Sequence, residues 1–204
     1  SPLWIYHPGE MPPAMLALRP SLSGKKLLTT QTFRDLFRSE VIKTDETLSI
    51  KDITFLFTDL KGSTAMYERI GDAKAYFLVH QHFDALSRVI RDRNGAIVKT
   101  IGDAVMAVFD NPVEATNAAL EMIDALNQFN HTISQELILK VGIHRGHSMA
   151  VTVNERIDYF GQTVNIAARV QALADANEVY LTADVYNSPG VRDVLNAHRV
   201  VPAE

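Results

Sequence analysis

The feature that most constrains this chain is a two-residue break between two short apolar runs. The runs cover residues 96–101 and 104–109, and only Gly102 and Asp103 separate them. Glycine beside aspartate suits the tight turns that join antiparallel strands, so this segment predicts a β-hairpin. Asp103 is then expected to be exposed at the hairpin tip.

A second acidic residue ends another predicted strand. Residues 53–58 are apolar and β-branched, which is typical of a strand buried on both faces, and Asp59 follows directly. A central strand beside the hairpin would bring Asp59 and Asp103 together. Paired carboxylates repel each other unless a cation lies between them, and hard oxygen ligands favour magnesium or manganese. Taken singly, Asp59 also fits a helix cap and Asp103 a simple turn residue.

The remaining pattern alternates between helix and strand. Apolar residues recur at helical spacing after Gly71, until Asn94 and Gly95 stop the helix, and again after Asn111 and Pro112. Further elements are predicted as strands at 137–144, 149–153, 155–159 and 179–181 and as a helix at 161–173. The order β-α-β-β-α-β predicts an α+β fold, the ferredoxin-like sandwich.

The amino-terminal part reads differently from the rest. Five of the eight prolines lie in residues 1–28, which predicts a linker or the remnant of an upstream domain. Apolar residues at helical spacing over 30–42 predict an amphipathic helix, so residues 29–50 are interpreted as a connecting helix and lead-in, and 51–204 as the main domain. The helix can serve packing alone or relay a signal from upstream. Because the chain begins with serine, an upstream regulatory domain is expected.

Composition excludes several classes of function. The formal net charge is -4 and the basic residues are scattered, so nucleic acid is not an expected partner. The absence of cysteine excludes disulfides and thiolate catalysis and fits a reducing, cytoplasmic location. The longest apolar run, 104–109, is too short to span a bilayer, and no membrane insertion is expected.

A second polar set lies in the predicted helix 161–173. Asn165 and Arg169 are four residues apart and so share one helix face. Arginine offers a fixed fork of donors suited to phosphate, and asparagine can donate to and accept from a sugar. Purely structural interpretations stay open, because Arg169 could pair with Asp158 and Asn165 could tie down a loop.

Three motifs together carry a family resemblance. FTDLKGST (57–64), KTIGDA (99–104) and YFGQTVNIAAR (159–169) follow one another in an order that resembles the catalytic domain of class III adenylate and guanylate cyclases, over about residues 50–200. The resemblance implies two divalent cations, Mg²⁺ or Mn²⁺, and a homodimer that shares its sites between subunits. It also implies the following roles: Asp59 and Asp103, with the Leu60 backbone as a further ligand, bind metal; Lys99 and Asp158 read the purine; Asn165 orients the ribose; Arg169 stabilises the transition state.

The expected activity is the conversion of ATP to cyclic AMP and pyrophosphate. An ammonium and a carboxylate at Lys99 and Asp158 complement the adenine edge, yet the same pair can serve guanine, so a guanylate cyclase is one alternative. Structural interpretations also stay open, because Lys99 could be a solvated lysine at a strand end and Asp158 could pair with Arg156 or Arg145. A catalytically silent module that dimerises or senses nucleotide is another. A diguanylate cyclase is disfavoured because its Gly-Gly-Asp/Glu-Glu-Phe hairpin is absent.

The carboxy-terminal end departs from the family pattern, and the histidines have to be assigned either to a metal site or to the structure. The last lysine is Lys140, so the carboxy-terminal lysine that holds triphosphate in the family is missing, and the domain is interpreted as truncated at that end. Four histidines, which lack the spacing of a helical zinc pair, are interpreted as structural or surface residues: His80, His82, His144 and His147.

Overall fold

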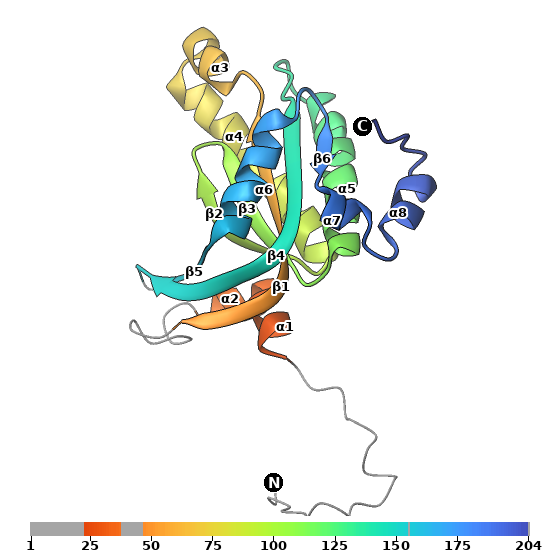
Figure 1. Ribbon diagram of the computed structural model, residues 1–204. Helices are drawn as coiled ribbons and strands as arrows, with labels where there is room; N and C mark the ends of the chain where they lie inside the picture. The colour runs from red at the N-terminus through yellow and green to blue at the C-terminus, as the bar shows by residue number, and fades with distance from the viewer. Residues whose placement is uncertain (1–22, 38–46, 155, 204) are drawn as a thin grey trace, which may run out of the picture.

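The computed structural model describes residues 23–37, 47–154 and 156–203. Six strands of this part of the chain form one sheet in the order β2-β3-β1-β4-β5, with β6 beside β4 (Figure 1). The strands are β1 Leu48–Leu60, β2 Ala96–Ile101, β3 Ala104–Phe109, β4 Leu139–Val153, β5 Arg156–Phe160 and β6 Val179–Leu181. All pairings are antiparallel except that of β6 with β4. The order β2-β3-β1-β4 is the ferredoxin-like arrangement, and the predicted fold class is confirmed.

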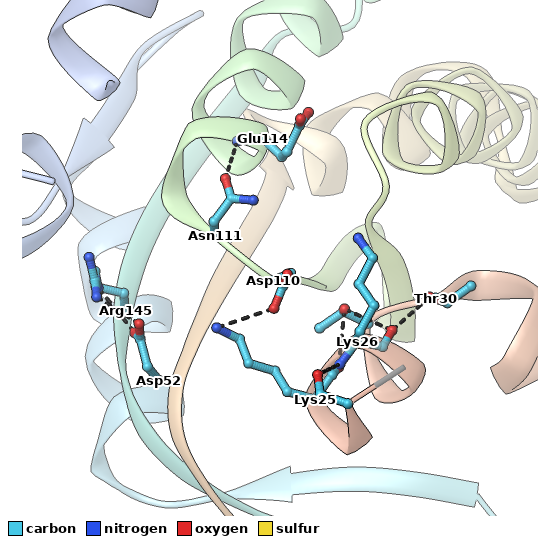
Figure 2. A network of polar contacts seen from close by, with 10 residues as sticks. Lys25, Lys26, Thr30, Asp52, Asp110, Asn111, Glu114 and Arg145 are labelled. Atoms are coloured by element: carbon cyan, nitrogen blue, oxygen red, sulfur yellow. Dashed lines mark hydrogen bonds and ion pairs between the residues drawn. The ribbon is translucent and has the colours of Figure 1, made fainter. Parts of the chain in front are cut away.

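Helices connect and cover these strands. They are α1 Gly24–Leu28, α2 Gln31–Leu36, α3 Ser63–Ile70, α4 Asp72–Asp92, α5 Pro112–Asn130, α6 Gln162–Leu173, α7 Ala183–Tyr186 and α8 Val191–Ala197. The start of α5 follows the predicted signals, because the Asn111 side chain accepts a hydrogen bond from the Glu114 backbone N–H at 3.0 Å and Pro112 occupies the first turn (Figure 2). None of the helices in the described ranges is long and apolar enough to cross a membrane.

Two hydrophobic cores lie on opposite faces of the sheet. Strand β1 serves both, because alternate side chains point to opposite faces. Leu56 packs with α4 and α5 in the first core, whereas Phe55 and Phe57 belong to the second core with Ala167 of α6 and Leu28 of α1. Helices α1 and α6, which lie far apart in the sequence, therefore pack on the same face of the sheet.

Helix α6 approaches β4 closely at two glycines. A side chain at Gly142 would collide with the backbone of Gln171, and one at Gly146 would meet the Thr163 hydroxyl at 2.9 Å. The absence of these side chains lets α6 lie directly on the strand, and this contact fixes the helix that carries Asn165 and Arg169.

One prediction of separate strands is wrong. The segments 137–144 and 149–153 were interpreted as two strands, but β4 runs without a break from Leu139 to Val153. Both halves pair with β1, from Leu60 opposite Leu139 to Leu48 opposite Ala150, and a register shift between Ile50 and Ile53 absorbs the bend. Pairing with the long strand β1 thus keeps residues 145–148 in β4, although their polar sequence indicates a break between two strands.

The amino-terminal helix is also shorter than predicted. Helix α2 ends at Leu36, and the predicted continuation to residue 42 lies in 38–46, outside the described residues. The division of the chain at residues 28 and 50 stays a prediction. In the structure, Leu28 is 2% exposed in the second core, and Lys25 forms an ion pair with Asp110 at 3.2 Å (Figure 2). Helices α7 and α8 were not predicted.

Candidate active site

The hairpin turn holds Asp103 against the end of β1. Ile101 pairs with Ala104 across the two-residue turn, and Gly102 adopts a φ of 62° that suits glycine. The residue after the turn is tied to β1, because the Val105 backbone N–H donates to the Thr58 hydroxyl at 3.1 Å. The expectation that Asp103 is exposed is therefore wrong: it is half-buried, and its Oδ2 is buried with no hydrogen-bond partner among the described residues.

Asp59 lies close enough to Asp103 for the two charges to interact. Burial and then the charge of Asp103 raise the pKa of Asp59 above its ordinary value, while the charge of Lys140, its partner residue on β4, acts in the opposite direction. The cap interpretation of Asp59 fails, because α3 begins after Gly62 without any side-chain cap hydrogen bond. The structure thus places two carboxylates together with too little positive charge between them.

This acidic pair fits a hard divalent cation. An unpartnered buried carboxylate oxygen at Asp103 and a raised pKa at Asp59 both indicate negative charge that lacks compensation. Within the described residues no group of three or more histidine, cysteine, aspartate or glutamate side chains could hold a metal ion. A cation here would complete its coordination with backbone oxygens, water or substrate, as magnesium commonly does.

Lys99 and Asp158 meet across the two edges of the sheet. Lys99 lies on β2 and Asp158 on β5, and Lys99 Nζ is 2.5 Å from Asp158 Oδ2. The side chains are 42% and 14% exposed, so the pair is open on the lysine side. Asp158 Oδ1 also accepts a hydrogen bond from the Tyr159 backbone N–H at 2.8 Å.

The alternatives weighed for this pair do not hold. Lys99 is not a solitary solvated lysine, since it pairs with Asp158. Arg145, which the sequence offered as a partner for Asp158, instead donates to Asp52 at 2.7 and 3.1 Å (Figure 2). Lys99 and Asp158 are therefore positioned by their mutual ion pair and by the edge strands on which they lie, β2 and β5.

Asn165 and Arg169 lie on the exposed side of α6. Both side chains are exposed, and neither forms a hydrogen bond or ion pair with any residue in the described part of the chain. Arg169 thus does not pair with Asp158. Leu173, one turn further along, is 69% exposed, whereas Thr163 and Ala167 face the sheet. The outward face of α6 carries polar and apolar groups that nothing in the described chain covers.

The four histidines fall into different environments. His80 and His147 are exposed, whereas His82 and His144 are buried. The Nδ1–H of His82 donates to the Val79 carbonyl at 2.6 Å, its Nε2 is buried without a partner in the described residues, and burial lowers its pKa to about 4. A neutral, packed imidazole agrees with the structural interpretation.

Sequence reasoning missed Arg34 on α2. Its side chain is 9% exposed, and its guanidinium contacts both edge strands of the sheet. The available signal was an arginine directly after Phe33 within the predicted amphipathic helix.

Residues 46–195 match the model of the adenylate and guanylate cyclase catalytic domain. This match covers more than half of the chain, which therefore belongs to that family.

Named relatives include cyclases of both kinds. The chain is 34% identical over 139 residues to an adenylate cyclase of Anabaena cylindrica, covering 61% of this chain and 28% of that protein. It is 29% identical over 150 residues to the receptor-type guanylate cyclase Gyc76C of Drosophila melanogaster, covering 67% of this chain and 10% of that protein. The chain thus spans less than a third of either relative.

Solved structures share the fold. The adenylyl cyclase CyaB of P. aeruginosa superposes with a TM-score of 0.64 at 24% identity, covering 73% of this chain and 84% of that chain. The catalytic core of a rhodopsin-guanylyl cyclase with converted specificity, in complex with ATPalphaS, superposes with a TM-score of 0.65 at 22% identity, covering 69% and 82%.

Proposed function

We propose that this chain is an adenylate cyclase that converts ATP to 3′,5′-cyclic AMP and pyrophosphate in a homodimer with two divalent cations. One observation carries the choice of substrate most directly. Lys99 Nζ and Asp158 Oδ2, which come from the two edge strands, lie 2.5 Å apart and present one donor group beside one acceptor group.

Adenine complements this pair. Its N1 is an acceptor that the Lys99 ammonium can satisfy, and its amino group is a donor that the Asp158 carboxylate can accept. A polar group that loses its water and finds no new hydrogen-bond partner costs free energy. A base whose donors and acceptors match Lys99 and Asp158 is therefore favoured. Base binding would exchange part of the Lys99–Asp158 contact for contacts with the purine.

The reaction needs no protein nucleophile. The ribose 3′-hydroxyl attacks its own α-phosphorus, the bond to the oxygen bridging to the β-phosphate breaks, pyrophosphate leaves, and the hydroxyl proton passes to solvent. Asp59, Asp103 and the Leu60 carbonyl would hold two cations, Mg²⁺ or Mn²⁺, and in the bound state such cations favour the ionised hydroxyl and neutralise the leaving group. Arg169 would donate to the α-phosphoryl oxygens as they gain charge, and Asn165 would orient the ribose.

The exposed face of α6 supports the homodimer. Asn165 and Arg169 have no partners in the described chain, and Leu173 beside them is 69% exposed. Since one chain carries both the acidic pair and the α6 pair, a two-fold dimer would form two equivalent sites, each combining groups of both subunits. The upstream regulatory domain expected from the sequence is part of the same proposal.

The test is product formation by the chain with Mn²⁺ and either ATP or GTP, beside Asp59→Ala and Asp103→Ala. Cyclic AMP that falls by at least about a hundredfold in both variants is expected, because one group that stabilises charge in the transition state contributes that much. Both variants should remain folded by circular dichroism. An ATP turnover that survives both substitutions would contradict the proposal.

Guanylate cyclase is the second candidate, favoured by the similarity to the Drosophila guanylate cyclase. The same two side chains can serve guanine, with Lys99 donating to O6 and Asp158 accepting from N1–H. A dominant cyclic GMP product would change the substrate but leave the site intact. A folded dimer that makes neither product would instead favour the silent module.

A further inference from the structure

The two edge strands of the sheet are joined by one buried arginine. Arg34 Nη2 donates to the Ile157 carbonyl of β5 at 2.6 Å, and Arg34 Nε donates to the Ile97 carbonyl of β2 at 3.2 Å. Strands β2 and β5 stand at opposite ends of the strand order, so no ladder of backbone hydrogen bonds connects them directly. Arg34 supplies the connection that the sheet itself lacks.

Neighbouring groups hold this arginine in place. The Ile97 backbone N–H donates to the Gln31 side chain at 2.7 Å, so α2 satisfies both backbone groups of one residue on the exposed edge of β2. The Arg34 guanidinium also lies over the Tyr159 ring, 5.7 Å from its centroid. The side chain is 9% exposed, and it has few alternative positions.

The bridge lies next to the proposed base-reading pair. Ile157 directly precedes Asp158 on β5, and Ile97 precedes Lys99 by two residues on β2. Between Ile97 and Lys99 the pairing with β3 shifts by one residue, a bulge that changes the direction in which Lys99 leaves the strand. The Lys99–Asp158 contact and the Arg34 bridge therefore span the same gap between strands, one open to solvent and one buried.

We infer that Arg34 is a positioning residue for base recognition: by holding β2 and β5 at a fixed separation, it keeps Lys99 and Asp158 where both can contact one purine. This inference rests on the proposed function. Without Arg34, the polar contact that remains between β2 and β5 in the described chain is made by a lysine with four rotatable side-chain bonds, and such a contact survives a wide range of strand separations. The two charged groups would stay paired with each other, but the donor and acceptor would no longer match the spacing of the base edge.

Arginine suits this role better than lysine. Its rigid fork donates to two carbonyls at once in one plane, whereas an ammonium presents a compact charge that cannot reproduce this geometry. Arg34→Lys therefore keeps the charge and most of the packing but loses the double bridge. Arg34→Met removes both the charge and the donors.

The experiment compares Arg34→Lys and Arg34→Met with Lys25→Met. Lys25 anchors the same amino-terminal segment through its ion pair with Asp110 (Figure 2), and its side chain forms no hydrogen bond or ion pair with the described residues of β2 or β5, so it is the matched control. For both Arg34 variants we expect the KM for ATP to rise about tenfold and the ATP-to-GTP ratio of kcat/KM to shrink by a similar factor, the size of one hydrogen bond to a charged group. The kcat values should change less, and Arg34→Lys should lie nearer to wild type.

Hydrogen exchange gives a second readout that does not depend on turnover. Amides of 97–101 and 156–160 should exchange about tenfold faster in the Arg34 variants than in Lys25→Met, if the bridge restrains these strands. Unchanged KM, base selectivity and exchange in folded Arg34 variants would overturn the inference while leaving the proposed function standing. Absence of cyclase activity in the wild-type protein extended past Glu204 would refute the proposed function, and the exchange rates would then still decide whether Arg34 restrains the two strands.

Discussion

The acidic pair at the end of β1 (Asp59 and Asp103) and the acid–base pair between β2 and β5 (Lys99 and Asp158) differ in how far the protein neutralises their charge. Burial and the charge of Asp103 both raise the pKa of Asp59, and the charge of Lys140 and a backbone hydrogen bond at Leu60 offset this only in part. Asp158 has a lysine at 2.5 Å and a backbone N–H at 2.8 Å. One site is electrostatically incomplete in the protein alone, whereas the other is satisfied by the protein itself.

The difference indicates what each site requires from a ligand. An incomplete acidic pair gains free energy from a cation, so its ligand supplies charge. A satisfied ion pair gains only when a ligand replaces its contacts with equally good ones, so its ligand must match in geometry. Under the proposed function, the first site would therefore select its ligand by charge and the second by the pattern of hydrogen-bond donors and acceptors on the base.

The largest expected effect follows from removing the acidic pair. Asp59→Ala or Asp103→Ala should lower kcat by at least about a hundredfold, since metal-held charge acts on the transition state itself. Asp193→Asn, an exposed carboxylate in the first turn of α8, is the control and should leave kcat within about twofold of wild type. The rate of cyclic nucleotide formation is measured for each variant. An equal loss in the control Asp193→Asn would contradict a special role for the acidic pair.

Removing one partner of the acid–base pair should have a smaller effect of another kind. Lys99→Met leaves Asp158 without its cation, and we expect kcat/KM for ATP to fall about tenfold, mainly through KM. Lys25→Met breaks the ion pair with Asp110 and serves as the control for the loss of a lysine charge. Steady-state kinetics with ATP and GTP measure the change. A pure loss of kcat at constant KM would move Lys99 from base recognition to the chemical step.

Metal addition should stabilise only the incomplete site. At a hundredfold excess over its dissociation constant, Mn²⁺ should raise the free energy of unfolding by about 2.7 kcal/mol, or the melting temperature by about 5–10 °C. The double variant Asp59→Asn, Asp103→Asn should not respond to Mn²⁺, and without metal it should melt above the wild type because the repulsion is gone. Scanning calorimetry with and without Mn²⁺ measures both, and an equal response of the two proteins would place the cation elsewhere.

The smallest effect is a pH dependence that distinguishes paired from unpaired carboxylates. A hydrogen bond from Arg93 lowers the pKa of Glu121 below 4.5, so this group stabilises the fold above pH 4.5 and loses that contribution as the pH falls through the lowered value. Asp59 has the opposite sign, because its pKa is raised in the folded protein: it costs stability as the pH rises above its ordinary value of 3.8, and this cost is complete once the pH exceeds the raised value. Urea unfolding should therefore show Glu121→Gln less stable than wild type at pH 7, with a difference that shrinks as the pH is lowered below 4.5. A difference that does not change with pH would assign the effect to packing.

Much of the local structure could be predicted from short stretches of sequence. The hairpin at Gly102 and Asp103, the capped start of α5 at Asn111 and the helix that carries Asn165 and Arg169 all match their signals. Turn and cap preferences depend on a few neighbouring residues, so they can be read without knowing the fold. The three motifs in turn indicated the family to which the chain belongs.

Contacts between distant residues could not be predicted in the same way. Nothing near Asp103 in the sequence shows that the end of β1 covers the turn and leaves a carboxylate oxygen buried. The continuity of β4 depends on its pairing with β1, and the role of Arg34 depends on strands 63 and 123 residues away. Such features arise when the sheet brings separate segments together.

The sequence by itself therefore determined which groups are present and the local turns and helices that carry them, because those depend on neighbouring residues. Only the tertiary structure decided which charges are compensated. Lys99 and Asp158 are 59 residues apart and meet because the two edges of the sheet approach each other, whereas the charge of Asp103 acts on Asp59 and raises its pKa, an effect that Lys140 offsets only in part. Electrostatic energy depends on distance and burial, and both are fixed only when the strands have packed.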